Sequence, residues 1–277
     1  MIKNGGGCAA ALVISARTQR NNCFMNLDIQ KANTWKRISA WLFDAILLGI
    51  AAVLFGLILS AAVGYDRQNA AMDAHYADYE ARYGVSLTIS EGDYQAMSPE
   101  AQAKYHQAME AFSRDNDVLY TYNLLINLTL VVTGIGILLA FLALEFAVPL
   151  VFGNGQTLGK KIFGVALMRT DCVKINAVSL FIRTLLGKYT IETMIPVMLL
   201  FMMFMGTIGI VGPLVLLAIG LTQIILYAAT STNSLIHDSL ANTVAVDMAS
   251  QMIFDTQEQM IEYKKKLHAE RVSRQVY

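Results

Sequence analysis

The stretch ISAWLFDAILLGIAAVLFGLILSAAV, residues 38–63, is an apolar run that only two serines and Asp44 interrupt. A helix needs about 20 predominantly apolar residues to cross a bilayer, so the run predicts a first transmembrane helix. Trp35 and Trp41 lie near its start, where interfacial aromatic side chains gather. The stretch indicates a membrane protein and raises the question of why an aspartate stands inside it.

The composition agrees with a membrane protein. Of the 277 residues 55% are hydrophobic and 15% are charged, whereas soluble domains carry about 25% charged residues. The formal net charge is zero, so we expect no nucleic-acid partner. The three cysteines form no CxxC pair, and the four histidines show no pair at metal-ligand spacing. We therefore expect no disulfide framework, no metal site and no cofactor.

Three further apolar runs predict three more transmembrane helices, over residues 124–150, 190–205 and 208–229. The run over 190–205 is short and contains Glu192 and Pro196, so we expect it to be tilted, interrupted or only partly inserted. The fold class is thus an all-α polytopic membrane protein with about four transmembrane helices. Residues 1–34 are expected to be a disordered or leader segment, and translation starting at Met25 is an alternative to Met1.

Residues 64–118 are polar, with four basic and ten acidic side chains, which favours the extracytoplasmic side. Three tyrosines follow helical spacing: Tyr76, Tyr79 and Tyr83. Gly84 is expected to end that helix, and Ser98 with Pro99 to begin another. We predict an extracytoplasmic helical hairpin, in which the tyrosines either pack between the helices or face a partner.

The connector over residues 153–188 holds six basic side chains and one acidic side chain, so the positive-inside rule places it in the cytoplasm with both termini. Two alternating stretches, 164–168 and 172–176, predict a small cytoplasmic β-hairpin, which residues 243–247 can join as a third strand. Residues 179–189 are amphipathic and are expected to lie along the membrane interface. Residues 251–277 are expected to form a cytoplasmic amphipathic tail.

Asp44 lies about 9 Å inside the first span, at 1.5 Å per residue from Ile38. A carboxylate near a helix centre costs roughly 2.5–3.5 kcal/mol on insertion scales. Arg37 shares its face but lies about 10.5 Å away along the axis, too far for easy pairing. Asp44 is therefore either protonated or paired across the bundle, for a structural or a proton- or ion-handling purpose. Candidate partners are Lys160, Arg183 and His237.

A second polar group follows the last span in NSLIHDSLANT, residues 233–243. His237 and Asp238 are either a proton relay pair or a helix cap that anchors the segment. Asp238 is expected on the same side of the membrane as Arg37 and Asp44, so these three residues are predicted to form one polar cluster.

The chain resembles the RDD family of small bacterial integral membrane proteins, named for one arginine and two aspartates. Arg37 and Asp44 match the first pair, and Asp238 in HDSLANTVAV matches the second aspartate. Between them, GQTLGKKIFGVAL matches a family motif at Gly155, Thr157, Gly159, Lys160 and Gly164, and Arg183 matches an arginine that follows the motif. The resemblance covers about residues 35–247. The long 64–118 insertion and ANT in place of the more usual AGT depart from the family pattern.

The resemblance implies a membrane transporter or permease, and some family members resemble cation/proton antiporters. Asp44 would then titrate, with Arg37 and Asp238 orienting it, and Thr157, Gly159, Lys160, Arg183 and His237 supporting them. The alternative is an accessory or scaffold protein whose extracytoplasmic hairpin binds a partner. We find no nucleophile–base pair in the sequence that would indicate an enzyme. We expect an RDD-like domain over 35–250 in the bacterial plasma membrane, in contact with lipid, exchanging protons or monovalent cations, and assembled as a homo-oligomer.

Overall fold

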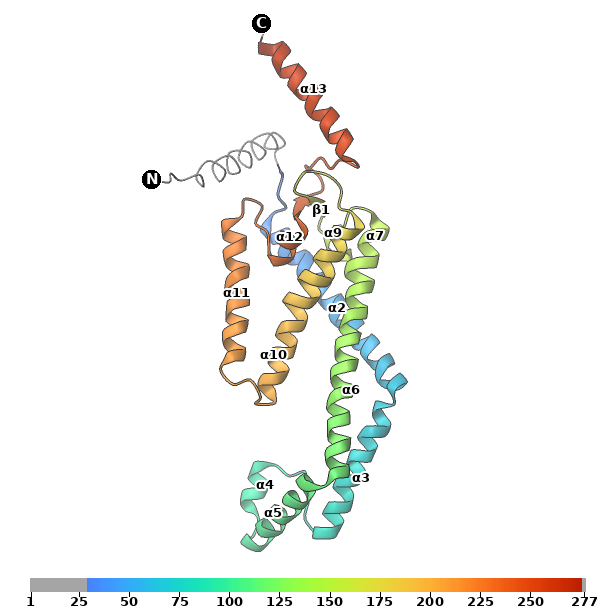
Figure 1. The fold of residues 1–277 in the computed structure, drawn as a ribbon, viewed down its shortest axis with the longest axis vertical. Coiled ribbons are helices and arrows are strands. Elements are labelled where there is room, and N and C mark those ends of the chain that lie inside the picture. Colours follow the sequence, from blue (N-terminus) through green and yellow to red (C-terminus); the bar gives the residue numbers. More distant parts are fainter. Residues whose placement is uncertain (1–28, 276–277) are drawn as a thin grey trace, which may run out of the picture. The chain divides into compact units, whose positions relative to one another are not determined.

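The computed structural model describes residues 29–275, so the predicted leader and the question of Met25 lie largely outside the described residues. The described residues form two compact units. One holds the residues up to Leu48 and those from Phe141 onward, and the other holds Gly49–Ala140. Figure 1 traces both units along the chain.

Four helical segments are long and apolar enough to cross a membrane, which confirms an all-α polytopic membrane protein. They are α2 (Thr34–Val63), α6–η1–α7 (Asn116–Ala140, Phe141–Ala147, Val148–Phe152), α9–η2–α10 (Ala177–Phe181, Ile182–Met194, Ile195–Phe204) and α11 (Val211–Ala229). The third segment is continuous over 28 residues. Residues 179–189, predicted as a separate interfacial stretch, instead belong to this helix because no break separates them from the apolar run.

Two of these segments contain π-helices, in which the backbone bonds run from residue i to i+5. Each π-helix ends just before a proline, Pro149 or Pro196. Proline has no N–H to offer the carbonyl four residues earlier. At Glu145 the hydroxyl of Thr184 bonds that carbonyl instead, at 3.0 Å. The change of helical pitch thus coincides with the two prolines, and the hydrogen bond from Thr184 ties η2 to η1.

A two-stranded antiparallel sheet pairs β1 (Val165–Arg169) with β2 (Thr243–Asp247). The small sheet was predicted, but not its pairing, because residues 172–176 make only isolated bridges rather than the second strand of a hairpin. Both faces of the sheet are buried. Phe254 and Met260, the latter from α13 (Gln257–Gln275), cover one face and Ala32 covers the other. The sheet thus joins the connector to the segment after the last span.

The insertion contains three helices, α3 (Tyr65–Tyr83), α4 (Glu91–Ala96) and α5 (Pro99–Arg114). As predicted, α3 ends at a left-handed Gly84, and the Ser98 side chain caps α5. α4 was not predicted. Tyr76 stacks on Phe112, and Tyr79 meets the same ring edge-on, so the tyrosine stripe packs within the unit. The reading of these tyrosines as core residues is confirmed.

Within this unit α2 and α6 approach each other closely at Gly136. A Cβ added there would lie 3.2 Å from the Ala52 carbonyl oxygen and 3.2 Å from the Gly56 nitrogen. Small residues let helix backbones approach in this way inside membranes. The glycines therefore determine where these two helices cross.

Candidate functional site

Asp44 receives its partners from α8 (Leu158–Ile162), a short helix in the basic connector. The Gly159 N–H donates to Asp44 Oδ1 at 2.8 Å, and the Thr157 hydroxyl donates to Oδ2. A Cβ at Gly159 would lie 2.4 Å from the Ala40 carbonyl oxygen, so only glycine allows this approach. Asp44 therefore accepts one bond from a backbone N–H in the first turn of α8 and one from the hydroxyl of its N-cap residue, at a helix end where a negative charge is favoured.

Lys160 is the basic residue closest to Asp44, which confirms one of its three candidate partners. Its Nζ lies 3.1 Å from Thr157 Oγ1 and 3.9 Å from Asp44 Oδ2, and the residue is only 8% exposed. Burial, and next the nearby charge of Lys188, lower the pKa of Lys160 to about 7. Its ammonium group is therefore poised to lose a proton near neutral pH.

Asp238 lies in α12 (Ile236–Ala241) and is 1% exposed. Its Oδ1 accepts a bond from Arg183, and its Oδ2 lies 3.5 Å from Arg37 Nη2. Arg183 also donates to Thr243 Oγ1 at 2.8 Å, and Arg37 donates to the Asn233 carbonyl at 2.9 Å. Two guanidinium groups from different helices thus converge on one carboxylate.

His237 does not pair with Asp44. Its Nδ1 lies 2.7 Å from a carboxylate oxygen of Glu192, which can only accept, so Nδ1 carries the proton. Nε2 lies 3.7 Å from Asp238 Oδ2, beyond hydrogen-bond distance. Burial, and next the charge of Arg183, lower the pKa of His237 to about 3, so the ring is neutral at physiological pH.

A further pair joins the two π-helices, since Lys188 Nζ lies 2.7 Å from Glu145 Oε1. The predicted site omitted Glu145, Lys188 and Glu192. Their signal was available, because each is a charged residue in or beside an apolar run, and both glutamates stand four residues before a proline.

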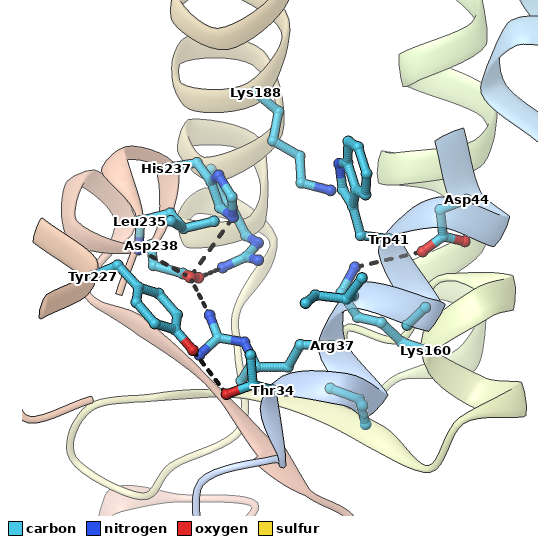
Figure 2. Close-up of a pocket in the computed structure, with 15 residues that line it drawn as sticks. Thr34, Arg37, Trp41, Asp44, Lys160, Lys188, Tyr227, Leu235, His237 and Asp238 are labelled. Carbon is cyan, nitrogen blue, oxygen red and sulfur yellow. Dashed lines mark hydrogen bonds and ion pairs between the residues drawn. The ribbon is translucent and has the colours of Figure 1, made fainter. Parts of the chain in front are cut away.

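A cavity of about 390 Å³ lies among these groups. Six charged side chains line it: Arg37, Asp44, Lys160, Arg183, Lys188 and Asp238. Figure 2 shows Asp44 with Lys160 on one side and Asp238 with Arg37 and His237 on the other, while Lys188 extends toward the space between them.

The predicted cluster of Arg37, Asp44 and Asp238 is therefore divided. Arg37 bonds Asp238, whereas Asp44 belongs with α8. All eight predicted site residues nevertheless lie in this region: six of them line the cavity, and the other two, Thr157 and Gly159, support Asp44. Among residues 29–275 no group of three or more histidine, cysteine or acidic side chains is arranged to hold a metal ion.

Comparison with curated proteins and with solved structures gives no match. Comparison with protein families matches the RDD family over residues 31–242, a range that contains Arg37, Asp44 and Asp238. The match covers most of the chain, including the four apolar helical segments and α12. The chain is a member of the RDD family of membrane proteins.

Proposed function

We propose that this protein is a membrane transporter and that the cavity lined by the RDD residues is the site that a solute or ion occupies during passage. The observation that carries the proposal is the cavity itself. A cluster of ion pairs with a purely architectural role would be packed with side chains. Here charged groups from α2, α8, η2 and α12 surround about 390 Å³ of space, within the size range of small-molecule sites.

The positions of the charges also support transport. Ionisable residues inside transmembrane segments are costly, and they mark ion and substrate pathways in membrane proteins. Arg37, Asp44, Glu145, Arg183 and Lys188 all belong to helices that are long and apolar enough to span a bilayer. We place the protein in the bacterial plasma membrane with both termini in the cytoplasm, on the strength of the basic connector.

Exchange of a monovalent cation for a proton is the specific form of transport that we propose for Asp44. Its two carboxylate oxygens accept bonds from Thr157 and Gly159. A cation that binds Asp44 must replace those donors, so exchange requires α8 to move away from α2. Lys160, which shares this environment, is placed to respond to the same movement.

Vesicles that contain the purified protein and an internal pH dye test this proposal. Addition of sodium, lithium or potassium salts is expected to alkalinise or acidify the lumen according to the direction of the gradient. Asp44→Asn is expected to abolish the change, whereas Asp66→Asn, in the acidic insertion, is expected to leave it intact. Absence of flux with every cation, or full flux in Asp44→Asn, would contradict cation/proton exchange.

An accessory role is a second candidate, and one observation favours it. The insertion has an aromatic core of its own around Tyr79 and Phe112, which gives it the character of a small folded module. We propose that such a module binds a partner protein in the accessory case. Photo-crosslinking from Lys104, a residue of α5 in the insertion whose side chain is 53% exposed, in the full-length protein in cells tests this. Reproducible recovery of one crosslinked partner, together with an absence of flux in the vesicle assay, would favour the accessory role over transport.

A further inference from the structure

The wall of the cavity presents more positive than negative charge. The basic side chains that line it are Arg37, Lys160, Arg183 and Lys188, and the acidic ones are Asp44 and Asp238. Two more acids, Glu145 and Glu192, hold Lys188 and His237 without lining the cavity. Because positive groups face the space and half of the acids stand behind them, the cavity is electrostatically suited to an anion.

The acceptors of the cavity are already engaged. Each oxygen of Asp44 receives a hydrogen bond from α8. Asp238 Oδ1 receives bonds from Arg183 and Thr243, and Oδ2 faces the Arg37 guanidinium and the Leu235 N–H, each at 3.5 Å. Among the described residues that line the cavity, neither carboxylate therefore offers an oxygen without a donor to an entering cation while α8 stays in this position.

Donors, by contrast, remain available. The Lys160 ammonium group carries three N–H donors, and one of them is directed at Thr157 at 3.1 Å. Asp44 is 3.9 Å from Lys160 Nζ, which is an ion pair but too long for a hydrogen bond. The Arg37 guanidinium has five donors and uses two of them, for Asn233 and Asp238. An entering anion can thus gain hydrogen bonds without displacing an existing pair.

The remaining wall is largely apolar. It consists of Ile38, Ala40, Trp41, Val165, Leu235 and Ala245. Trp41 is 63% exposed, so the apolar wall continues to the outer surface of α2. A ligand that suits both parts of the cavity has an anionic head and a hydrophobic body.

We propose that the cavity binds a phosphate monoester carried on an apolar body, with Lys160 and Arg37 as the headgroup contacts and Trp41 beside the apolar part. Lysine and guanidinium groups both form charge-assisted hydrogen bonds with phosphate oxygens. The inference goes beyond the cation/proton exchange proposed at Asp44, because it names an anionic solute class for the remainder of the cavity. It rests on the proposed transport function for passage across the membrane but not for binding.

Binding to the purified protein in a neutral detergent tests the inference. The probes are inorganic phosphate, hexyl phosphate and dihexanoyl phosphatidic acid, with dihexanoyl glycerol as the probe that lacks a phosphate. Calorimetry or native mass spectrometry is expected to detect both organic phosphates and to detect no binding of the glycerol. Tighter binding of the phosphatidic acid identifies a lipid as the source, and tighter binding of hexyl phosphate identifies a soluble metabolite, both in support of the site. Failure of both organic phosphates to bind overturns the inference.

Two neighbouring lysines give a matched pair of variants. Lys160→Met is expected to weaken the organic phosphates by about tenfold or more, because a charge-assisted bond is lost. Lys161→Met removes the same charge from an exposed position and is expected to leave affinity unchanged. Equal effects of the two substitutions would show nonspecific attraction and would overturn the site.

Trp41→Ala provides an independent test should Lys160→Met fail to fold. Since Trp41 is largely exposed, we expect the variant to fold. It is expected to weaken both organic phosphates while leaving inorganic phosphate unaffected, and an unchanged affinity for all three probes would overturn the proposed ligand. These measurements contain no flux. If the purified protein binds the organic phosphates but shows no flux in the vesicle assay, the transport proposal alone is refuted. If it shows flux but binds neither organic phosphate, the ligand class alone is refuted.

Discussion

Asp44 and Asp238 are two buried carboxylates of the same cavity, but they are held in opposite ways. Asp238 is paired with two guanidinium groups from α2 and η2. Asp44 accepts hydrogen bonds from a backbone N–H and a hydroxyl, which are neutral, and its nearest cation is the lysine at 3.9 Å. One acid is fixed by permanent charges, and the other by groups that a small movement of α8 can withdraw.

The difference assigns separate roles to the two sides of the cavity. Arginine keeps its charge at all physiological pH values, so the Asp238 side is a constant electrostatic wall that joins three segments of the chain. Lysine changes its pKa readily when buried, and the pKa of Lys160 lies near 7. The Asp44 side is therefore where we expect protonation, ligand binding and helix movement to be coupled.

The largest expected effect concerns the fixed pair. Asp238→Asn leaves Arg183 and Arg37 buried without a carboxylate and is expected to cost about 3–5 kcal/mol of unfolding free energy. Unfolding by titration with a denaturing detergent in mixed micelles measures this. Asp247→Asn is the control, since Asp247 forms an ion pair with Lys36, which is 45% exposed, and its loss is expected to cost about 1 kcal/mol or less. Equal losses of unfolding free energy in Asp238→Asn and Asp247→Asn would show that the buried Asp238 pair contributes no more than a surface ion pair.

The second effect is a pH dependence that belongs to Lys160. Its pKa is about 7 in the folded protein against 10.5 for the free side chain. Between these values the unfolded chain binds the extra proton, so stability rises with pH, by at most about 1.4 kcal/mol per pH unit. Unfolding free energies at pH 7.5 and 9.5 are expected to differ by up to about 2.7 kcal/mol more in the wild type than in Lys160→Met. Lys161→Met is expected to keep the wild-type pH dependence of the unfolding free energy. If this variant lost that dependence, the effect would come from surface charge instead of Lys160.

A smaller effect is expected at Asp44 than at Asp238. In Asp44→Asn the amide oxygen can still accept from Gly159, and the amide nitrogen can donate to Thr157, so only the charge is lost. We expect a loss of about 1.5 kcal/mol in the same detergent titration. A loss as large as that of Asp238→Asn would mean that Asp44 is also part of a fixed ion pair.

The smallest effect tests the cap of α8. Thr157 caps the helix and bonds Asp44, so Thr157→Val is expected to cost about 1 kcal/mol. Thr222→Val in α11, where the threonine is exposed and bonds only its own helix, is the control and is expected to change stability little. An indistinguishable pair of variants would show that α8 is held by its backbone alone.

Much of this arrangement was predictable from the sequence, for identifiable physical reasons. Runs of apolar residues predicted the four spans because bilayer thickness sets their length. Ser98 and Gly84 predicted helix ends because their chemistry acts locally. Asp44 was correctly expected to need a partner from another segment. The free-energy cost of a carboxylate inside an apolar run can be recognised from the run itself.

The division of the site was not predictable in the same way. Arg37 and Asp44 share a helix face, yet Arg37 pairs with Asp238, which is 201 residues away in the sequence. The strand partner of β1 is likewise β2 rather than the adjacent segment. Such pairings depend on how α12 and α8 dock against α2, which no local pattern encodes.

Titration of Lys160 tests most directly whether the Asp44 side of the cavity is the adjustable one. Nitrogen-15 NMR of the lysine side chains in micelles, with Lys160 assigned by its absence in Lys160→Arg, measures the midpoint. A midpoint near pH 7 is expected, moving lower in Asp44→Asn because the Asp44 charge raises the pKa of Lys160. A midpoint near 10.5, the ordinary value for lysine, would show that Lys160 is permanently charged, and it would contradict the difference between the two acids.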